Sequence, residues 1–99
     1  MSEKLGERVL LENERIRIWD HPIPAGSMED CHTHRNPYVA VVVQGGTAEI
    51  WNEEGDTTQR FDFEEGQTLY FGADVLPTTH AVTNRSGRDI RMILVELLG

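Results

Sequence analysis

Residues 26–46 of this chain read GSMEDCHTHRNPYVAVVVQGG. From Tyr38 to Gln44 the stretch is almost continuously apolar, which predicts a β-strand buried on both faces. The glycine pair at 45 and 46 predicts that this strand ends in a tight turn. Ahead of it, His32 and His34 are two residues apart, and side chains at that spacing point to one face of an extended chain. The stretch therefore predicts a buried strand beside two imidazoles that can bind the same ion.

Short apolar segments of the same kind continue on both sides of this stretch. They are rich in Val, Ile, Trp, Tyr and Phe and are separated by Gly, Pro, Asn or Asp, whereas helical periodicity is hard to find. Prolines 22 and 24 predict that the chain after the second segment is extended and poorly paired. The pattern indicates an all-β fold of eight or nine strands, which include residues 8–12, 15–20, 38–44, 47–51, 57–63, 68–71, 80–84 and 90–97.

The length of the chain limits the architecture. With 99 residues it has room for one domain, residues 1–99, with a single core. Many short strands bury their apolar faces economically in an antiparallel jelly-roll β-barrel, and a β-sandwich is the alternative. Small barrels hold a ligand site inside, so inward-facing polar residues are the first candidates for function.

Charge and cysteine content exclude several classes of partner and site. Nine basic residues face 17 acidic ones, and the net charge of −8 argues against binding to nucleic acid or to an anionic membrane surface. The longest apolar run falls far short of a membrane helix, and the first residues are too polar for a signal peptide, so a cytoplasmic protein is expected. Cys31 is the sole cysteine, which excludes an intrachain disulfide and a multi-cysteine metal site.

Two motifs in order give the sequence a family resemblance. Gly26, five further residues, the pair His32 and His34, an apolar strand and Gly45 resemble the first motif of the cupins. Gly66 opens a stretch resembling their second motif, which closes with His80, three residues and Asn84. The chain thus resembles small single-domain cupins over nearly its whole length. The resemblance implies a double-stranded β-helix, the cupin form of the jelly-roll barrel.

The resemblance also implies a metal site. It makes His32, His34 and His80 metal ligands inside the barrel and Asn84 a structural residue at a turn. The chain departs from the first motif, because the Glu that follows the second His by four or five positions is replaced by Tyr38 or Val39. Tyr38 has the same parity as the two histidines, so we expect its phenol to face the site as a hydrogen-bond donor or weak ligand.

Loss of that Glu changes the chemistry expected of the site. Three neutral imidazoles leave a divalent ion with its full +2 charge, and such a site resembles those of cupin thiol and diketone dioxygenases. Fe(II) is the favoured ion, with Ni, Zn or Mn as alternatives. The expected substrate is a small anionic metabolite, as in the breakdown of β-alanine and related amino acids, with Tyr38 and His80 as catalytic residues.

Two other functions stay open at this point. One is a cupin that binds a small molecule or a metal without chemistry. The other is a metal-free isomerase or epimerase that uses His80 and Tyr38 as base and acid, which requires both groups to flank one substrate atom. The resemblance also implies a homodimer, and Val9, Leu10 and Leu11 are suited to pairing or exchange of an N-terminal strand. His21, next to a proline, is predicted to be solvent-exposed and is not assigned to the site.

Overall fold

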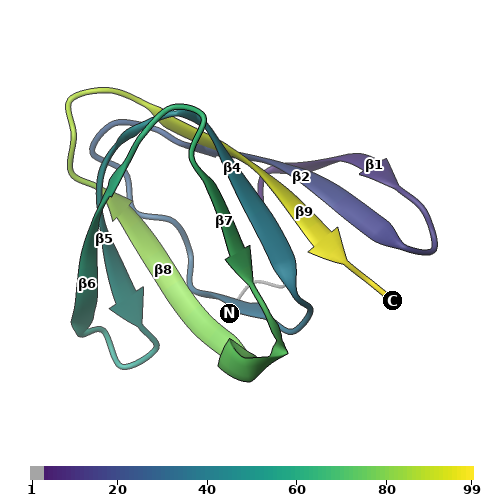
Figure 1. The fold of residues 1–99 in the computed structure, drawn as a ribbon. Coiled ribbons are helices and arrows are strands. Elements are labelled where there is room, and N and C mark those ends of the chain that lie inside the picture. Colours follow the sequence, from purple (N-terminus) through teal and green to yellow (C-terminus); the bar gives the residue numbers. More distant parts are fainter. Residues whose placement is uncertain (1–3) are drawn as a thin grey trace.

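The computed structural model describes residues 4–99, which form two antiparallel sheets that face each other (Figure 1). The five-stranded sheet contains, in spatial order, β1 (Arg8–Glu12), β2 (Ile16–Ile23), β9 (Ile90–Leu97), β4 (Tyr38–Gln44) and β7 (Thr68–Phe71). The four-stranded sheet contains β3 (His32–His34), β8 (Thr78–Asn84), β5 (Gly46–Asn52) and β6 (Thr57–Phe63). A short 3-10 helix, η1 (Ala73–Val75), lies between β7 and β8.

From β2 onward the chain passes repeatedly from one sheet to the other, as a double-stranded β-helix requires. The prediction of an all-β jelly roll is therefore confirmed. The strand ladders of residues 4–99 do not join the two sheets edge to edge, so the facing sheets are open rather than closed into a hydrogen-bonded barrel. Within the same residues, no helix is long and apolar enough to span a lipid bilayer.

The core lies between the sheets because each strand alternates inward and outward side chains. In β4 the inward residues are buried and the outward ones are partly exposed. In β6 the rings of Phe61 and Phe63 point to the same face and stack with centroids 5.4 Å apart, as the alternation around Asp62 predicts. The buried residues of this core include Trp19, Ile23, Tyr38, Val42, Phe63, Ile90, Met92 and Leu94.

The prediction that the chain pairs poorly after Asp20 is wrong. Strand β2 continues to Ile23 and stays in register with β9, where Pro22 lies opposite Arg91. Proline is tolerated because β1 begins only opposite Asp20, so Pro22 has a neighbouring strand on one side. A missing N–H on the free side of β2 costs no ladder hydrogen bond.

Strand β4 differs from its prediction in two ways. It is not buried on both faces, since Val39 and Val41 are partly exposed and Val43 is 47% exposed. The glycines after it do not form a hairpin turn either, because Gly45 carries the chain from the five-stranded sheet to the four-stranded one, where Gly46 already belongs to β5. An apolar run predicts that the face of the strand toward the core is buried, but it does not show whether anything covers the face away from the core.

Replacement of Gly45 by alanine is expected to destabilise the fold by about 3 kcal/mol, as backbone clashes in cores do. A Cβ at Gly45 would overlap the Phe63 carbonyl oxygen, so one of the two backbone segments must move. Gly87 is the matched control, because a Cβ there meets nothing within 4 Å. Urea unfolding of Gly45→Ala and Gly87→Ala tests the expectation, and equal midpoints would contradict it.

Candidate metal centre

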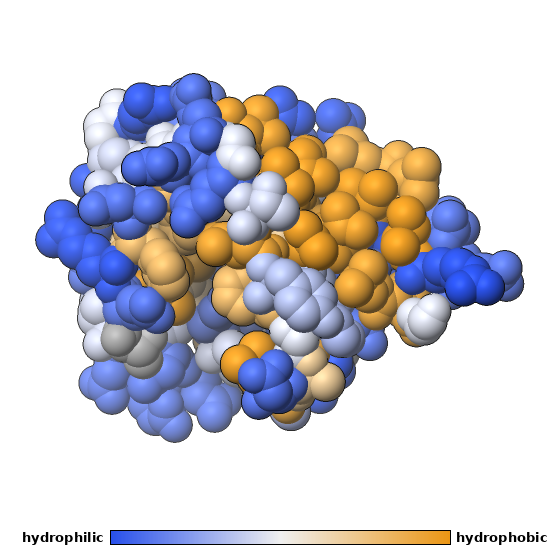
Figure 2. All heavy atoms as spheres, in the orientation of Figure 1, coloured by the Kyte–Doolittle hydropathy of each residue, from blue (hydrophilic) through white to orange (hydrophobic). Residues whose placement is uncertain are grey.

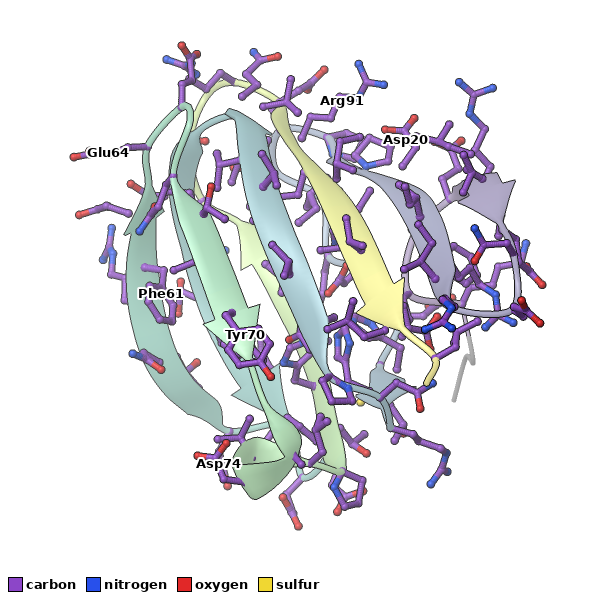
Figure 3. All side chains as sticks on the ribbon, turned by 45° about the vertical axis from the view of Figure 1, so that its right-hand side comes forward. Asp20, Phe61, Glu64, Tyr70, Asp74 and Arg91 are labelled. Carbon is purple, nitrogen blue, oxygen red and sulfur yellow. The ribbon has the colours of Figure 1, made fainter. Side chains whose placement is uncertain are left out.

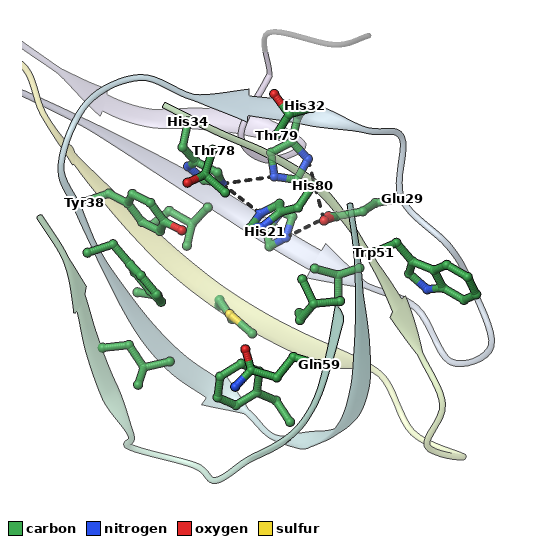
Figure 4. Close-up of a pocket in the computed structure, with 18 of the residues that line it drawn as sticks. His21, Glu29, His32, His34, Tyr38, Trp51, Gln59, Thr78, Thr79 and His80 are labelled. Atoms are coloured by element: carbon green, nitrogen blue, oxygen red, sulfur yellow. Dashed lines mark hydrogen bonds and ion pairs between the residues drawn. The ribbon is translucent and has the colours of Figure 1, made fainter. Parts of the chain in front are cut away.

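The pairing of β3 with β8 brings three histidines together. His32 lies opposite His80 in the antiparallel ladder, and His34 follows two residues along β3 on the same face. The His34 Nε2 atom is 3.1 Å from the Nε2 atoms of both His32 and His80. His32 and His34 are buried and His80 is partly buried (Figure 4). The three predicted ligands therefore lie close enough together that they could hold one metal ion.

The spacing of these nitrogens fits a divalent ion. With metal–nitrogen bonds of about 2.1 Å, two nitrogens lie about 3.0 Å apart at an octahedral angle and about 3.4 Å apart at a tetrahedral one. The 3.1 Å of the two pairs that include His34 falls between these values, and ligand atoms of all three histidines lie within 4.8 Å of one another. Three imidazoles on one side of an ion leave its remaining positions for other ligands. The residues present therefore fit a metal ion of the kind that the resemblance implies.

The protonation states of the histidines also suit a metal. Burial, helped by the neighbouring histidines, lowers the pKa of His34 to about 2. Burial and the nearby His32 lower the pKa of His80 to about 4. The Nδ1–H of His32 donates to the Asp30 carbonyl oxygen at 3.1 Å, which leaves the Nε2 lone pair of His32 directed to the site. Metals bind neutral imidazole, so at neutral pH no proton has to leave His34 or His80.

These two lowered pKa values predict that the metal-free protein loses stability in mild acid. An unfolded imidazole binds its proton near pH 6.5, but folded His34 and His80 stay neutral down to pH 4 or below. Below pH 6.5 the unfolded state therefore holds more protons, and the free energy of unfolding falls as the pH falls. Between pH 7.5 and pH 5 we expect a loss of about 2 kcal/mol per histidine.

Urea midpoints of the metal-free protein at the two pH values measure this loss. The His80→Gln variant is the control, since it should retain about half of the pH dependence. A wild-type midpoint that is the same at pH 5 and pH 7.5 would contradict the expectation.

Tyr38 faces the cavity beside the histidines, as its parity predicts. Its ring stacks on the imidazole of His34, with centroids 4.1 Å apart and planes at 15°. On its other side it stacks on the ring of Phe71 in β7, the strand that pairs with β4. Burial, with a smaller contribution from the charge of Glu29, raises the pKa of the Tyr38 phenol above its ordinary value. The phenol therefore stays protonated at neutral pH and can donate a hydrogen bond, while its ring holds His34 in place.

Two further residues line the cavity next to the three histidines, and the sequence analysis missed both. His21 was predicted to be exposed, but it is 8% exposed and its Nε2 lies 3.0 Å from Glu29 Oε2. The prediction fails because His21 shares its inward face of β2 with Trp19 and Ile23, and that alternation is the signal that could have found it. Glu29 belongs to the polar segment before β3, where nothing in the sequence marks it as buried.

The cavity between the sheets has a volume of about 370 Å³. The histidines lie toward one end of it, and Gln59 lies across from them (Figure 4). Within residues 4–99 no lysine or arginine lines the cavity. Glu29 supplies a carboxylate to the wall, and the histidine and tyrosine rings are the other titratable groups there. Most of the wall is apolar and includes Ile23, Ile50, Phe61, Phe71, Met92 and Leu94.

Arg17 and Arg91 form ion pairs outside the cavity. Arg91 donates from Nε to Asp20 Oδ1 at 2.8 Å, on the outer side of the five-stranded sheet, where Figure 3 shows the two residues together. Arg17 donates to Glu12 at 2.8 Å and to Glu96 at 3.3 Å. Both arginines stabilise pairs of strands and neither lines the cavity.

Comparison with solved structures identifies the fold. A cupin domain from Bordetella pertussis Tohama I superposes with a TM-score of 0.78 at 22% identity, over 91% of this chain and 88% of that one. An uncharacterized conserved protein with a double-stranded β-helix domain from Klebsiella pneumoniae gives 0.69 at 16% identity, over 92% and 74%. An RmlC-like cupin family protein from Methanocaldococcus jannaschii gives 0.64 at 12%, over 98% and 86%. No family model and no curated protein matches the sequence.

Proposed function

We propose that this chain, which has the cupin fold, binds one divalent metal ion on His32, His34 and His80 and is an enzyme of the dioxygenase type. One observation carries the proposal, namely three histidine nitrogens that lie within 4.8 Å of one another, with two of the pairs at 3.1 Å, and that open onto a cavity of small-molecule size. Fe(II) is the proposed ion, because imidazole ligands suit it and its open positions admit substrate and O₂.

The walls of the cavity support a substrate with a small anionic head and an apolar body. The lining residues within 4–99 include no lysine or arginine, so a bound metal is the positive charge available to an anionic group. Apolar and aromatic side chains form most of the remaining wall, and they favour hydrocarbon over charge. A small metabolite that chelates the ion through its acidic end fits both properties.

The roles of the protein groups follow from their protonation states. A metal ion bound here would supply a Lewis acid that polarises an anionic head group. His34 and His80 are neutral at the pH of the reaction, because their pKa values are about 2 and about 4. Tyr38 keeps its proton and is placed to donate a hydrogen bond to the head group, and the apolar walls exclude water from it.

Oxygen consumption tests the proposal. Metal-free protein is loaded with Fe(II) under anaerobic conditions, mixed with a 1,3-diketone or a small thiol acid, and exposed to O₂ in an oxygen electrode. We expect uptake with Fe(II) and none with Zn(II) or after chelation. His80→Ala should abolish uptake, whereas Gln59→Ala, across the cavity from the histidines, should retain it.

Two outcomes would overturn the dioxygenase proposal. Ligand-induced stabilisation without O₂ uptake from any probe indicates a binding protein without chemistry. Turnover that survives chelation indicates an isomerase or epimerase. The pKa of about 4 argues against that last function, because it makes His80 a weak base at neutral pH.

A further inference from the structure

We infer, on the basis of the proposed metal site, that Glu29 is a positioning residue for that site. Its carboxylate, held by His21, orients His32 from the side facing away from the ion and balances part of the ion's charge. In this way a carboxylate acts on the site without occupying a coordination position. The loss of the Glu from the first motif is then compensated in charge, while the open positions of the ion are preserved.

The contacts of Glu29 define this role. Its Oε2 lies 3.0 Å from Nε2 of His21, and its Oε1 lies 3.6 Å from Nδ1 of His32. The three side chains are 14%, 10% and 4% exposed, so their interactions are weakly screened by water. Oε1 is buried and accepts no hydrogen bond from any residue within 4–99. A buried carboxylate oxygen without a donor is costly unless a positive charge stabilises it, and a cation on the far nitrogen of His32 would do so.

His32 transmits this effect to the site. Its Nδ1–H donates to the Asp30 carbonyl oxygen, so its Nε2 lone pair faces the other histidines, and Glu29 Oε1 lies on the Nδ1 side of the ring at 3.6 Å. A carboxylate near the outer N–H of a metal-bound imidazole makes that imidazole a stronger ligand and fixes its orientation. His34 has no such support, because its Nδ1 is buried and without a partner in residues 4–99. Of His32 and His34, only His32 therefore has a neighbouring carboxylate that strengthens its bond to a metal ion.

Metal affinity separates this role from a purely structural one. Co(II) and Zn(II) dissociation constants are measured by competition with a chromophoric chelator, together with the Co(II) absorption spectrum. Glu29→Gln keeps the size of the side chain and removes its charge, and we expect affinity to fall by about 10- to 100-fold with a shift of the Co(II) bands. Glu53→Gln, in the exposed turn after β5, removes the same charge far from the site and should change neither quantity.

A second variant tests whether His21 acts through Glu29. His21→Gln should weaken metal binding less than Glu29→Gln does, and should have no further effect in the double variant. Melting temperatures of the metal-free variants report on the fold separately. Wild-type protein that binds no Co(II) overturns both the proposed function and the role of Glu29. Normal binding with equal affinity in wild type and Glu29→Gln overturns the role of Glu29 alone.

A different observation concerns the outer face of the five-stranded sheet. Its central rows are apolar across four strands, since Ile18 of β2 pairs with Val95 of β9, Val95 with Val39 of β4, and Val39 with Tyr70 of β7. Figure 2 shows hydrophobic residues gathered over this part of the molecule, and Tyr70 is 66% exposed. Charges on this face gather at one end, where Asp20 pairs with Arg91 and Arg8. We define these four apolar residues, with Val41 and Ile93 beside them, as the outer apolar face.

We propose that the homodimer implied by the resemblance forms through the outer apolar face, with the two faces packed around a two-fold axis. Four strands about 4.8 Å apart and about seven residues long cover about 450 Å² of flat area, and the relief of the side chains raises the accessible area toward the 600–1,000 Å² per partner of specific interfaces. With a net charge of −8, the chain favours self-association only through an uncharged surface, and this face is uncharged in its centre. A two-fold contact needs no complementary charge, because the same patch serves both partners.

Analytical ultracentrifugation tests the outer apolar face. We expect a dimer for wild type and for Thr47→Lys, which adds the same charge on the other sheet, and a monomer for Val95→Lys. Circular dichroism confirms that each variant is folded. A wild type that is monomeric at about 100 μM protein, which is about ten times the Kd expected of a modest interface, overturns the proposal. So does a dimer that survives Val95→Lys but is lost in Leu10→Lys, because that result indicates pairing through strand β1.

Discussion

His34→Ala is expected to leave the protein without stoichiometric metal. His34 is the central member of the site, because its Nε2 lies 3.1 Å from both of the other Nε2 atoms. If three imidazoles share a binding free energy on the order of 10 kcal/mol, removal of one costs about 3 kcal/mol, or about 100-fold in affinity. Metal content by mass spectrometry of untagged protein should fall from near one ion per chain to about a tenth or less.

The control for His34→Ala is a neighbouring residue without a ligand atom. Thr79 precedes His80 in β8 and carries a hydroxyl that pairs with the hydroxyl of Thr33 at 2.9 Å. Thr79→Ala should therefore keep the metal content of wild type. Equal metal content in His34→Ala and wild type, after reconstitution with Fe(II), Ni(II) or Zn(II), would contradict the three-histidine site. Absence of metal in both would mean that the site does not bind these ions.

Asn84→Ala is expected to cause the largest loss of stability among single substitutions considered. Asn84 is fully buried, and its amide donates to the carbonyl oxygens of Ile23 and Arg88, both at 2.8 Å. Its Oδ1 accepts from the backbone N–H of Ser86 at 2.9 Å and from the Ser86 hydroxyl at 2.7 Å. The side chain thus joins the end of β8 to β2 and to the loop before β9, the structural role at a turn that the resemblance implies.

Removal of this amide leaves the buried carbonyl oxygen of Ile23 without its donor and the backbone N–H of Ser86 without its acceptor, whereas the Arg88 carbonyl oxygen can still accept from the Ser86 hydroxyl. At about 1–3 kcal/mol for each unsatisfied buried group, we expect a loss of about 4 kcal/mol, or about 20 °C in Tm for a chain of this length. Asn52→Ala is the matched control, because Asn52 Oδ1 accepts from the N–H groups of Glu54 and Asp56 in an exposed turn. A loss of about 1 kcal/mol is expected there. Calorimetry of both variants decides, and equal losses would count against the role of Asn84.

Strand positions could be predicted from the sequence because they depend on local composition. The strands at 8–12, 38–44, 57–63, 68–71 and 90–97 coincide with β1, β4, β6, β7 and β9. The predicted strand bounds were less accurate where a strand is extended by pairing with a distant segment of the chain. Strand β8 begins at Thr78 rather than at His80, since Thr78 pairs with His34 from the distant strand β3. A short stretch of sequence carries no record of such a partner.

The candidate site was predictable in its ligands but not in the groups around them. The spacing of His32 and His34 follows from the two-residue period of a strand, and the second motif supplied His80. His21 and Glu29 were missed because their burial depends on which strands cover them. Neither the proline after His21 nor the polar neighbours of Glu29 report that the two side chains meet beside His32.

The amino-acid sequence by itself determined that this protein is built from short strands and that His32 and His34 share a face, because alternation is a property of the local chain. His80 was added to this pair by the family resemblance. Only the tertiary structure decided that the register of β3 against β8 places His80 opposite His32. It alone also placed a buried carboxylate behind His32 and left the outer apolar face uncovered within residues 4–99. These features arise from contacts between segments far apart in the chain, and burial is a property of the whole fold rather than of any one segment.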